Sequence, residues 1–250
     1  MKPVAIQLYS LREAAAKDFP GVLKAVADIG YVGVEFAGLH GYDPKEIAKL
    51  VDDLGLRVSS SHTGLPTKES VKDIVNVELA LGNKWVVTGF GPDAFGTMDA
   101  VCVAADKFNM AAELIKPHGM DFAIHNHWWE FDKVDGRYVF DILMENAPEI
   151  YSELDVYWTQ VGGANPAKIV SKYSSRMPLL HIKDGPGVKG QPHTAVGSGV
   201  MDIPSIIGAA DENTLQWVIV ELDECATDML EAVKKSYEYL TSKGLAKGNK

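Results

Sequence analysis

Four apolar segments of this chain end in side chains that can bind a metal ion. They are residues 122–127 (Phe-Ala-Ile-His-Asn-His), 152–158 (Ser-Glu-Leu-Asp-Val-Tyr-Trp), 179–184 (Leu-Leu-His-Ile-Lys-Asp) and 218–224 (Val-Ile-Val-Glu-Leu-Asp-Glu). Short apolar runs between helical patterns are typical of buried parallel strands. Because polar groups gathered at one end of such strands form a site, we expect the chemistry of this chain there.

Metal binding is favoured by these side chains together more than by any one of them. A single His181 after a strand is more often a structural histidine, Asp155 alone could cap a helix, and Glu221 alone could pair with a lysine. However, the three occupy equivalent positions of three successive strands, where a charged group inside an apolar run is costly unless it is paired or coordinated. The pattern therefore predicts a site for a divalent metal.

The elements that position these side chains alternate eight times between strand and helix. Strands are expected at 4–10, 32–36, 57–62, 85–90, 121–127, 151–157, 179–183 and 217–222, and helices at 19–29, 43–54, 68–81, 97–115, 138–145, 166–173, from 204, and at 229–240. Eight such units, with no linker between them, predict an α/β fold with one domain over residues 1–250, a single (β/α)8 TIM barrel. In such barrels the active site lies at the C-terminal ends of the strands.

Composition excludes several classes of partner. The net charge of −10 disfavours nucleic acid and anionic membranes, which are bound by clustered Lys and Arg. The two cysteines, Cys102 and Cys225, form no CxxC pair, so any metal must be held by histidines and carboxylates. No signal-like segment and no apolar run near the roughly 18 residues of a membrane span are present, which favours a cytoplasmic protein.

The chain resembles the xylose-isomerase-like TIM barrels, the superfamily of sugar phosphate isomerases/epimerases and AP endonuclease family 2. Its members include inosose dehydratase, hydroxypyruvate isomerase, dehydroshikimate dehydratase and endonuclease IV. The resemblance covers essentially the whole chain and rests on residues 7–10, 33–36, 125–131 (His-Asn-His-Trp-Trp-Glu-Phe), 153–158, 180–184, 197–202 and Glu221. In this order the motifs are specific to the superfamily, though not to a substrate.

The resemblance implies one divalent ion, held by Glu, Asp, His and Glu from strands five to eight. Asp155, His181 and Glu221 take the last three places. At the first place His125 stands where Glu is usual, and we favour Glu130, five residues later, as ligand or base, with His125 as the alternative ligand. Such a mixed site suits Mn, Zn, Co or Fe and also admits Mg.

The expected chemistry is removal of the proton next to the carbonyl of a keto-sugar, with the enediolate stabilised by the metal. Glu221 on one side and Glu130 or His127 on the other are the candidates for acid and base. Lys183 could stabilise the anionic intermediate or form a salt bridge with Asp184.

Substrate recognition is expected from aromatic and polar side chains at the same end of the barrel. The aromatic candidates for stacking on a sugar are Trp128, Trp129, Tyr157 and Trp158, and the polar candidates for binding hydroxyls are Gln7, Glu35 and His62. His40, His118 and His193 lie in turns and are expected to be solvated, although His193 belongs to a long loop that can reach the pocket.

That loop, residues 185–193, is rich in Gly and Pro and suggests a lid or a subunit contact. It lacks the Gly-Lys-Ser/Thr ending of a phosphate loop, which favours an unphosphorylated sugar or polyol. With an aromatic-rich mouth beside it, we expect a homo-oligomer.

Three functions remain open at this point. The first is a metal-dependent isomerase or epimerase of a keto-sugar or related polyol. The second is a lyase or dehydratase that acts on an inosose or a 3-keto-glycoside by the same enolisation. The third and weakest is an endonuclease IV-like repair enzyme, because this chain is acidic and has only seven histidines.

Overall fold

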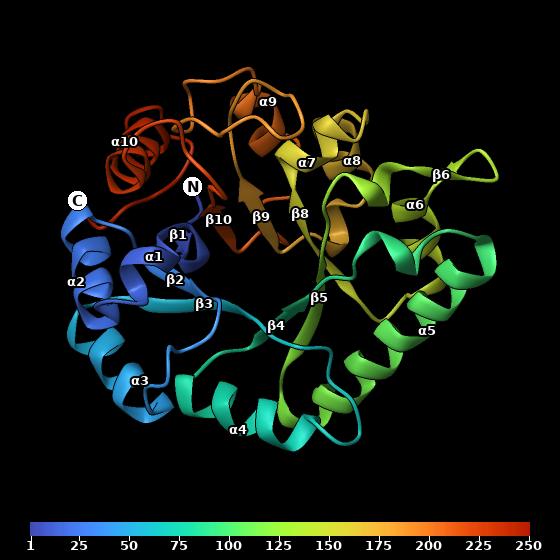
Figure 1. Cartoon of the computed structure of the whole chain (residues 1–250), viewed down its shortest axis with the longest axis horizontal. Helices are drawn as coiled ribbons and strands as arrows, with labels where there is room; N and C mark the ends of the chain where they lie inside the picture. Colours follow the sequence, from blue (N-terminus) through green and yellow to red (C-terminus); the bar gives the residue numbers. More distant parts are fainter.

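The computed structural model describes residues 1–250 and contains a closed barrel of eight parallel strands (Figure 1). The barrel strands are β1 (Val4–Gln7), β2 (Gly33–Phe36), β3 (Arg57–His62), β4 (Trp85–Thr88), β5 (Asp121–His125), β8 (Tyr151–Asp155), β9 (Leu179–Ile182) and β10 (Trp217–Val220). Each strand pairs with its neighbours in chain order, and β10 closes the ring on β1. The prediction of a single (β/α)8 barrel is confirmed.

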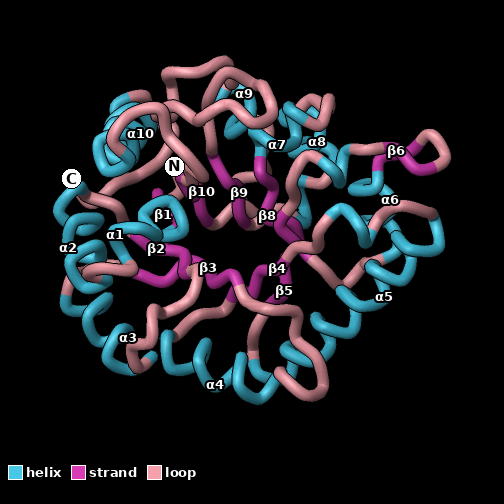
Figure 2. Tube along the Cα trace, viewed as in Figure 1, coloured by secondary structure: helices cyan, strands magenta, loops and turns pink.

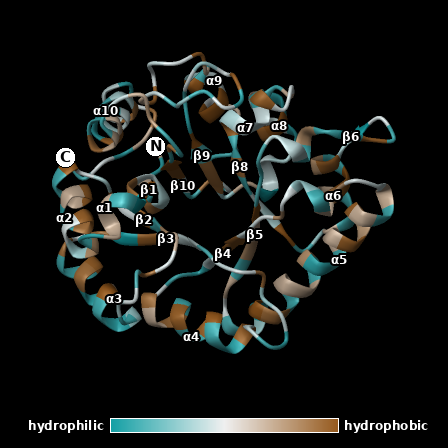
Figure 3. Cartoon of the chain, viewed as in Figure 1, coloured by the Kyte–Doolittle hydropathy of each residue, from teal (hydrophilic) through white to brown (hydrophobic).

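Helices form a ring outside the strands (Figure 2). They include α2 (Phe19–Ile29), α3 (Pro44–Asp53), α4 (Val71–Leu81), α5 (Met98–Ile115), α6 (Val139–Asn146), α8 (Pro166–Lys172), α9 (Ile203–Gly208) and α10 (Met229–Ser242). Several begin where a side chain accepts a backbone N–H of the first turn, as Asp43 does for α3 and Asp228 for α10. Figure 3 shows hydrophobic and hydrophilic residues alternating around these helices, as expected of helices with one buried face. None of them is both long and apolar enough to cross a membrane.

The interior of the barrel changes character along its axis. Its lower part is an apolar cluster that includes Ala5, Ala123, Leu179 and Ile219. Side chains two residues apart on a strand point to the same face, so the next inward position on each of these strands lies one layer closer to the C-terminal ends. On three of these strands the next positions are His125, His181 and Glu221, which are all buried. An ionisable layer therefore rests on an apolar floor.

Six barrel strands end one to three residues before the expected bounds, and two of them are followed directly by a helix. The segment expected as a strand to residue 10 leaves β1 at Gln7 and continues as the 3-10 helix η1 (Leu8–Leu11) and a short helix α1 (Arg12–Ala15). The segment expected to residue 157 leaves β8 at Asp155 and becomes helix α7 (Val156–Val161). The side chains of Gln7 and Asp155 accept N–H groups of these helices, at 3.0 Å from Tyr9 and 2.8 Å from Trp158, and so end the strands.

A small hairpin, β6 (Lys133–Val134) and β7 (Arg137–Tyr138), was not anticipated and projects beside α6 (Figure 1). Its turn is Asp135-Gly136, and both residues have positive φ, as a tight two-residue hairpin turn requires. The Asp-Gly pair was the available signal for it.

The long loop after β9 is anchored to its own barrel. The carboxylate of Asp184 accepts hydrogen bonds from the backbone N–H groups of Gly185, Gly197, Gly199 and Met201. A Cβ at Gly199 would lie 2.1 Å from Asp184 Oδ1, so only glycine fits there. The same loop is tied to the segment after β10, because Asp223 N donates to His193 Nδ1 at 3.0 Å.

Candidate metal and catalytic site

Four side chains at the C-terminal ends of adjacent strands form a compact group of potential metal ligands. They are His125 at the end of β5, Asp155 at the end of β8, His181 in β9 and Glu221 directly after β10. One ligand atom from each lies within 4.8 Å of the others, and all four residues are buried. Asp155 Oδ2 accepts no hydrogen bond from the protein, which is costly for a buried carboxylate. This donor set fits a divalent cation.

Glu130, favoured from sequence as the first ligand, lies outside this group. Its carboxylate instead accepts the backbone N–H of His127 at 2.8 Å and so holds the turn that follows β5. Glu130 is almost completely buried, and this burial raises its pKa to about 8. The structure thus brings His125, the alternative first ligand, into the group and keeps Glu130 out of it.

Lys183 neutralises the upper part of the site. Its ammonium nitrogen lies 3.0 Å from Asp155 Oδ2, 2.8 Å from Glu221 Oε2 and 3.0 Å from both carboxylate oxygens of Asp223. The contact with Asp155 is in ion-pair range without being an aligned hydrogen bond. Burial acts to lower the pKa of Lys183, but these carboxylates raise it well above its usual value. The expected alternative partner, Asp184, instead holds the loop.

A second layer of polar and ionisable groups lies below the first, that is, nearer the N-terminal ends of the strands. Gln7 and Glu35, expected to bind substrate hydroxyls, are fully buried and hydrogen-bonded to each other at 2.6 Å. His62 Nε2 lies 2.6 Å from Glu153 Oε2. Burial acts to lower the pKa of His62, but Glu35 and Glu153 raise it to about 10.

Glu153 was not recognised from the sequence as a site residue. The available signal was its spacing: it precedes Asp155 by two residues on β8, so both side chains point into the barrel. It is fully buried.

A pocket of about 400 Å³ opens above these groups and is lined by His62, His125, His127 and Trp129, with backbone of residues 88–91. The His127 ring stacks on Trp129, with ring centroids 4.2 Å apart. Burial and the nearby Lys183 lower the pKa of His127 to about 4, so its imidazole is neutral at pH 7. A neutral imidazole facing a pocket can accept a proton.

A second pocket, of about 290 Å³, lies at the same end of the barrel. Its walls include Trp128, Trp158, Lys189, His193 and Asp223. Tyr157 is fully buried instead, and its hydroxyl accepts the backbone N–H of Gly187.

The three histidines expected to be solvated differ in the structure. His40 and His118 are exposed. His193 is buried against the rings of Tyr157 and Trp158, so the expectation that it is solvated is wrong, because the loop folds over the mouth of the barrel.

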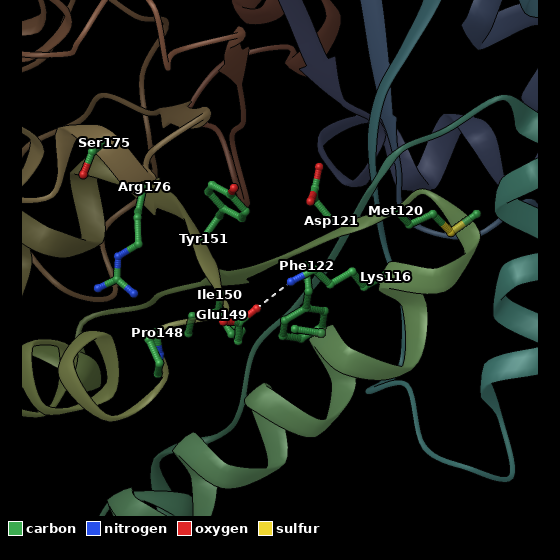
Figure 4. Close-up of a pocket in the computed structure, with 11 residues that line it drawn as sticks. Lys116, Met120, Asp121, Phe122, Pro148, Glu149, Ile150, Tyr151, Ser175 and Arg176 are labelled. Carbon is green, nitrogen blue, oxygen red and sulfur yellow. Dashed lines mark hydrogen bonds and ion pairs between the residues drawn. The ribbon is translucent and has the colours of Figure 1, made fainter.

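The opposite end of the barrel holds another pocket, of about 280 Å³, beside the starts of β5 and β8 (Figure 4). Asp121, Tyr151 and Arg176 line it, and Lys116 forms an ion pair with Glu149 at its edge, at 2.8 Å. Neither group of potential metal ligands lies there, and barrel enzymes work from the other end. We therefore assign the candidate site to the C-terminal ends of the strands.

Comparison with known proteins agrees with this architecture. Residues 23–243 match the family model of the xylose isomerase-like TIM barrel. A crystal structure of a sugar phosphate isomerase/epimerase from Parabacteroides distasonis is 30% identical, with a TM-score of 0.84, and the match covers 98% of this chain and 96% of that one. An inosose dehydratase from Clostridium beijerinckii is 24% identical over 90% of this chain and 89% of its own length. The crystal structure of an IolI protein with a bound zinc atom is 15% identical, with a TM-score of 0.73, over 97% of this chain and 99% of that one.

Proposed function

Because the chain belongs to the xylose isomerase-like TIM barrel family, we propose that it is a divalent-metal-dependent isomerase or epimerase of a keto-sugar or related polyol. The observation that carries this proposal is the group of four buried ligand atoms with the ammonium of Lys183 beside it. Clustered titratable groups of this kind, in a pocket at the C-terminal end of a barrel, are typical of a catalytic site.

The residues that would hold the metal are His125, Asp155, His181 and Glu221. Asp155 Oδ2 accepts no hydrogen bond, which leaves it open to a cation. Burial and the neighbouring histidines lower the pKa of His125, which suits a cation site because a ligand imidazole must be neutral. When bound, a Mn, Mg, Zn, Co or Fe ion would polarise the substrate carbonyl and stabilise the enediolate charge.

Glu221 and His127 are the proposed proton carriers. Burial acts to raise the pKa of Glu221, but Lys183 and His181 hold it well below its usual value, so the carboxylate is ionised and can accept a proton. Neutral His127 faces the pocket and would be the proton acceptor on its side, while Glu221, once protonated, would return the proton to the substrate. Glu130 lies outside the group of ligand atoms and accepts the backbone N–H of His127, so we assign it to holding the turn that carries His127.

Lys183 remains protonated, because three carboxylates surround its ammonium group. We assign it the role of stabilising negative charge on the substrate oxygen, as a buried cation in a site that excludes water does effectively. Its bidentate contact with Asp223 holds the ammonium group in place.

The sugar is proposed to lie in the pocket above His62, His125 and His127. Trp128 and Trp158 wall the neighbouring pocket, where the apolar C–H face of a sugar or a second part of the substrate could stack on them. Tyr157 is too deeply buried for this, so we do not assign it a contact with substrate.

A lyase or dehydratase is the second candidate, and a specific observation favours it. The relative from Clostridium beijerinckii, which aligns along 90% of this chain, is an inosose dehydratase. Elimination begins with the same proton removal and then needs an acid for the leaving group, a role open to His127 after it has gained a proton.

The test is incubation of the metal-loaded protein with keto-sugars, inososes and 3-keto-glycosides in D2O. Deuterium entering the carbon next to the carbonyl would establish enolisation, and the product would assign the class. Absence of exchange across the whole panel, with metal bound, would count against both candidates.

A further inference from the structure

We propose that Glu153 and Glu35 are positioning residues that set which ring nitrogen of His125 and His181 is free to bind a metal. The two carboxylates lie one layer below the proposed metal ligands and contact the lower nitrogen of each imidazole. This inference rests on the metal site proposed above. It assigns a role to two buried carboxylates that line neither of the pockets at this end of the barrel.

Each imidazole spans the two layers. In His181, Nδ1 faces up to Glu221 Oε2 at 2.9 Å, and Nε2 faces down to Glu35 Oε1 at 2.6 Å and Glu153 Oε2 at 3.1 Å. In His125, Nε2 lies 4.0 Å from Asp155 Oδ2 in the upper layer. Its Nδ1 lies 3.3 Å from Glu153 Oε2 in the lower layer, in ion-pair range without an aligned hydrogen bond. A single carboxylate oxygen thus lies within 3.3 Å of both rings from below.

Both nitrogens of His181 face a carboxylate, so these contacts would favour one tautomer of each ring once a metal takes the place of a proton on the upper nitrogen. A neutral imidazole carries one N–H and one lone pair, so a ring that donates its lower N–H to a carboxylate presents its lone pair on the upper nitrogen. His181 then offers Nδ1 and His125 offers Nε2 to the same point, beside Asp155 and Glu221. Histidine ligands generally depend on such a carboxylate partner, which fixes the ring orientation and raises the basicity of the ligand.

The lower layer is itself held in place. Gln7 Nε2 donates to Glu35 Oε1 at 2.6 Å, and the hydroxyl of Ser60 donates to Glu35 Oε2. His62 Nε2 lies 2.6 Å from Glu153 Oε2. Both carboxylates are fully buried, and an ionised group kept there needs such partners. Glu35 is thus held through both oxygens, and Glu153 is held through Oε2, the oxygen that lies near both imidazoles.

The alternative is that the lower layer binds a second cation itself, because His62, His125, Glu153 and His181 also form a group within 4.8 Å. Two ions would require His125 and His181 to bind metal through both ring nitrogens, and a neutral imidazole has only one lone pair for this. The geometry therefore favours one ion, with the lower carboxylates orienting its ligands.

The experiment titrates the metal-free protein with Co²⁺ and follows stoichiometry, affinity and the visible absorption of the bound ion. We expect one Co²⁺ per chain in the parent. Glu153→Gln should keep that stoichiometry, bind Co²⁺ roughly 10–100-fold more weakly, and alter the absorption bands, because the ligand orientation is lost. Glu78→Gln is the matched control: Glu78 is equally buried but bonded to Ser61 and Asn83, so its affinity and spectrum should equal the parent's.

Unchanged affinity and spectrum in Glu153→Gln would overturn the inference. The inference would also be overturned if the parent bound two Co²⁺ ions per chain and Glu153→Gln bound only one, since Glu153 would then be a metal ligand. If Glu153→Gln does not fold, Glu35→Gln tests the same role through His181 alone, with the same expected weakening and the same overturning results. Asp155→Ala separates the two proposals. If Asp155→Ala loses Co²⁺ while Glu153→Gln binds it as the parent does, the proposed metal site stands and only the positioning role is refuted. A parent that binds no Co²⁺ would overturn both.

Discussion

The ammonium nitrogen of Lys183 lies 2.8 Å from Glu221 Oε2, in a part of the barrel where both side chains are almost inaccessible to solvent. Asp155 and Asp223 complete the surroundings of this cation. Lys183 therefore balances carboxylates that would otherwise repel one another in a buried site.

Replacing this lysine should destabilise the metal-free protein strongly. We expect Lys183→Met to lower the free energy of unfolding by about 3–5 kcal/mol, because breaking a buried ion pair leaves uncompensated charge. Urea denaturation with chelator present measures this. The control is Lys116→Met, which removes an exposed ion pair with Glu149 and should change the free energy of unfolding little. Equal effects of the two substitutions would contradict the assigned role.

The metal ligands can be separated from their neighbour Glu130 by substitution. Asp155→Ala, His181→Ala and His125→Ala should each lose most of the bound metal, because each removes one of four converging ligand atoms. Glu130→Gln should retain it, since that carboxylate bonds to the backbone of His127. Elemental analysis after chelation and reloading decides the matter. Loss of metal in Glu130→Gln alone would restore Glu130 as the first ligand.

Glu221 is proposed to act both as a ligand and as a proton carrier, and the two roles predict different results. If it only holds the metal, Glu221→Gln should bind the ion weakly and regain full activity at high metal concentration. If it also moves the proton, deuterium exchange at saturating metal should remain slower by roughly 10²–10⁴-fold. Full recovery of exchange would transfer the proton role to His127.

Glu130 should make stability depend on pH. Its pKa of about 8 in the folded protein lies above that of an unfolded glutamate, so the native state binds the proton more tightly. The stability from this proton is complete at acidic pH and is lost as the pH rises through the window up to about 8, by at most roughly 1.4 kcal/mol per pH unit. Glu130→Gln should therefore gain stability relative to the parent between pH 5 and pH 9. Chemical denaturation across that range checks this, and parallel curves would refute it.

The aromatic wall of the second pocket should affect binding more than chemistry. Trp128→Ala is expected to raise KM for the best substrate with little change in kcat, because Trp128 lines the second pocket and the proton carriers Glu221 and His127 do not. Trp128→Phe keeps an aromatic face and should restore most of the affinity. A fall in kcat at unchanged KM would argue against a stacking role.

The fold and most of the ligand set could be predicted from the sequence, because the information that determines them lies in short stretches of the chain. The alternation of apolar runs with helical patterns is written along the chain, and strands in a parallel barrel end at one face, so Asp155, His181 and Glu221 had to converge. Spacing within a strand carries equally local information. It would have identified Glu153 from Asp155 two residues later, had it been applied to β8.

The remaining features depended on the tertiary structure, because they join segments whose separation in sequence says nothing about contact. Only the fold decided that His125 rather than Glu130 joins the group of metal ligands, since the carboxylate of Glu130 accepts a backbone N–H of its own turn. It also decided that Lys183 pairs with Asp223, 40 residues away, and leaves the adjacent Asp184 to hold the loop. Sequence determined which chemical groups reach the mouth of the barrel, and three-dimensional packing decided which nitrogen and oxygen atoms meet there.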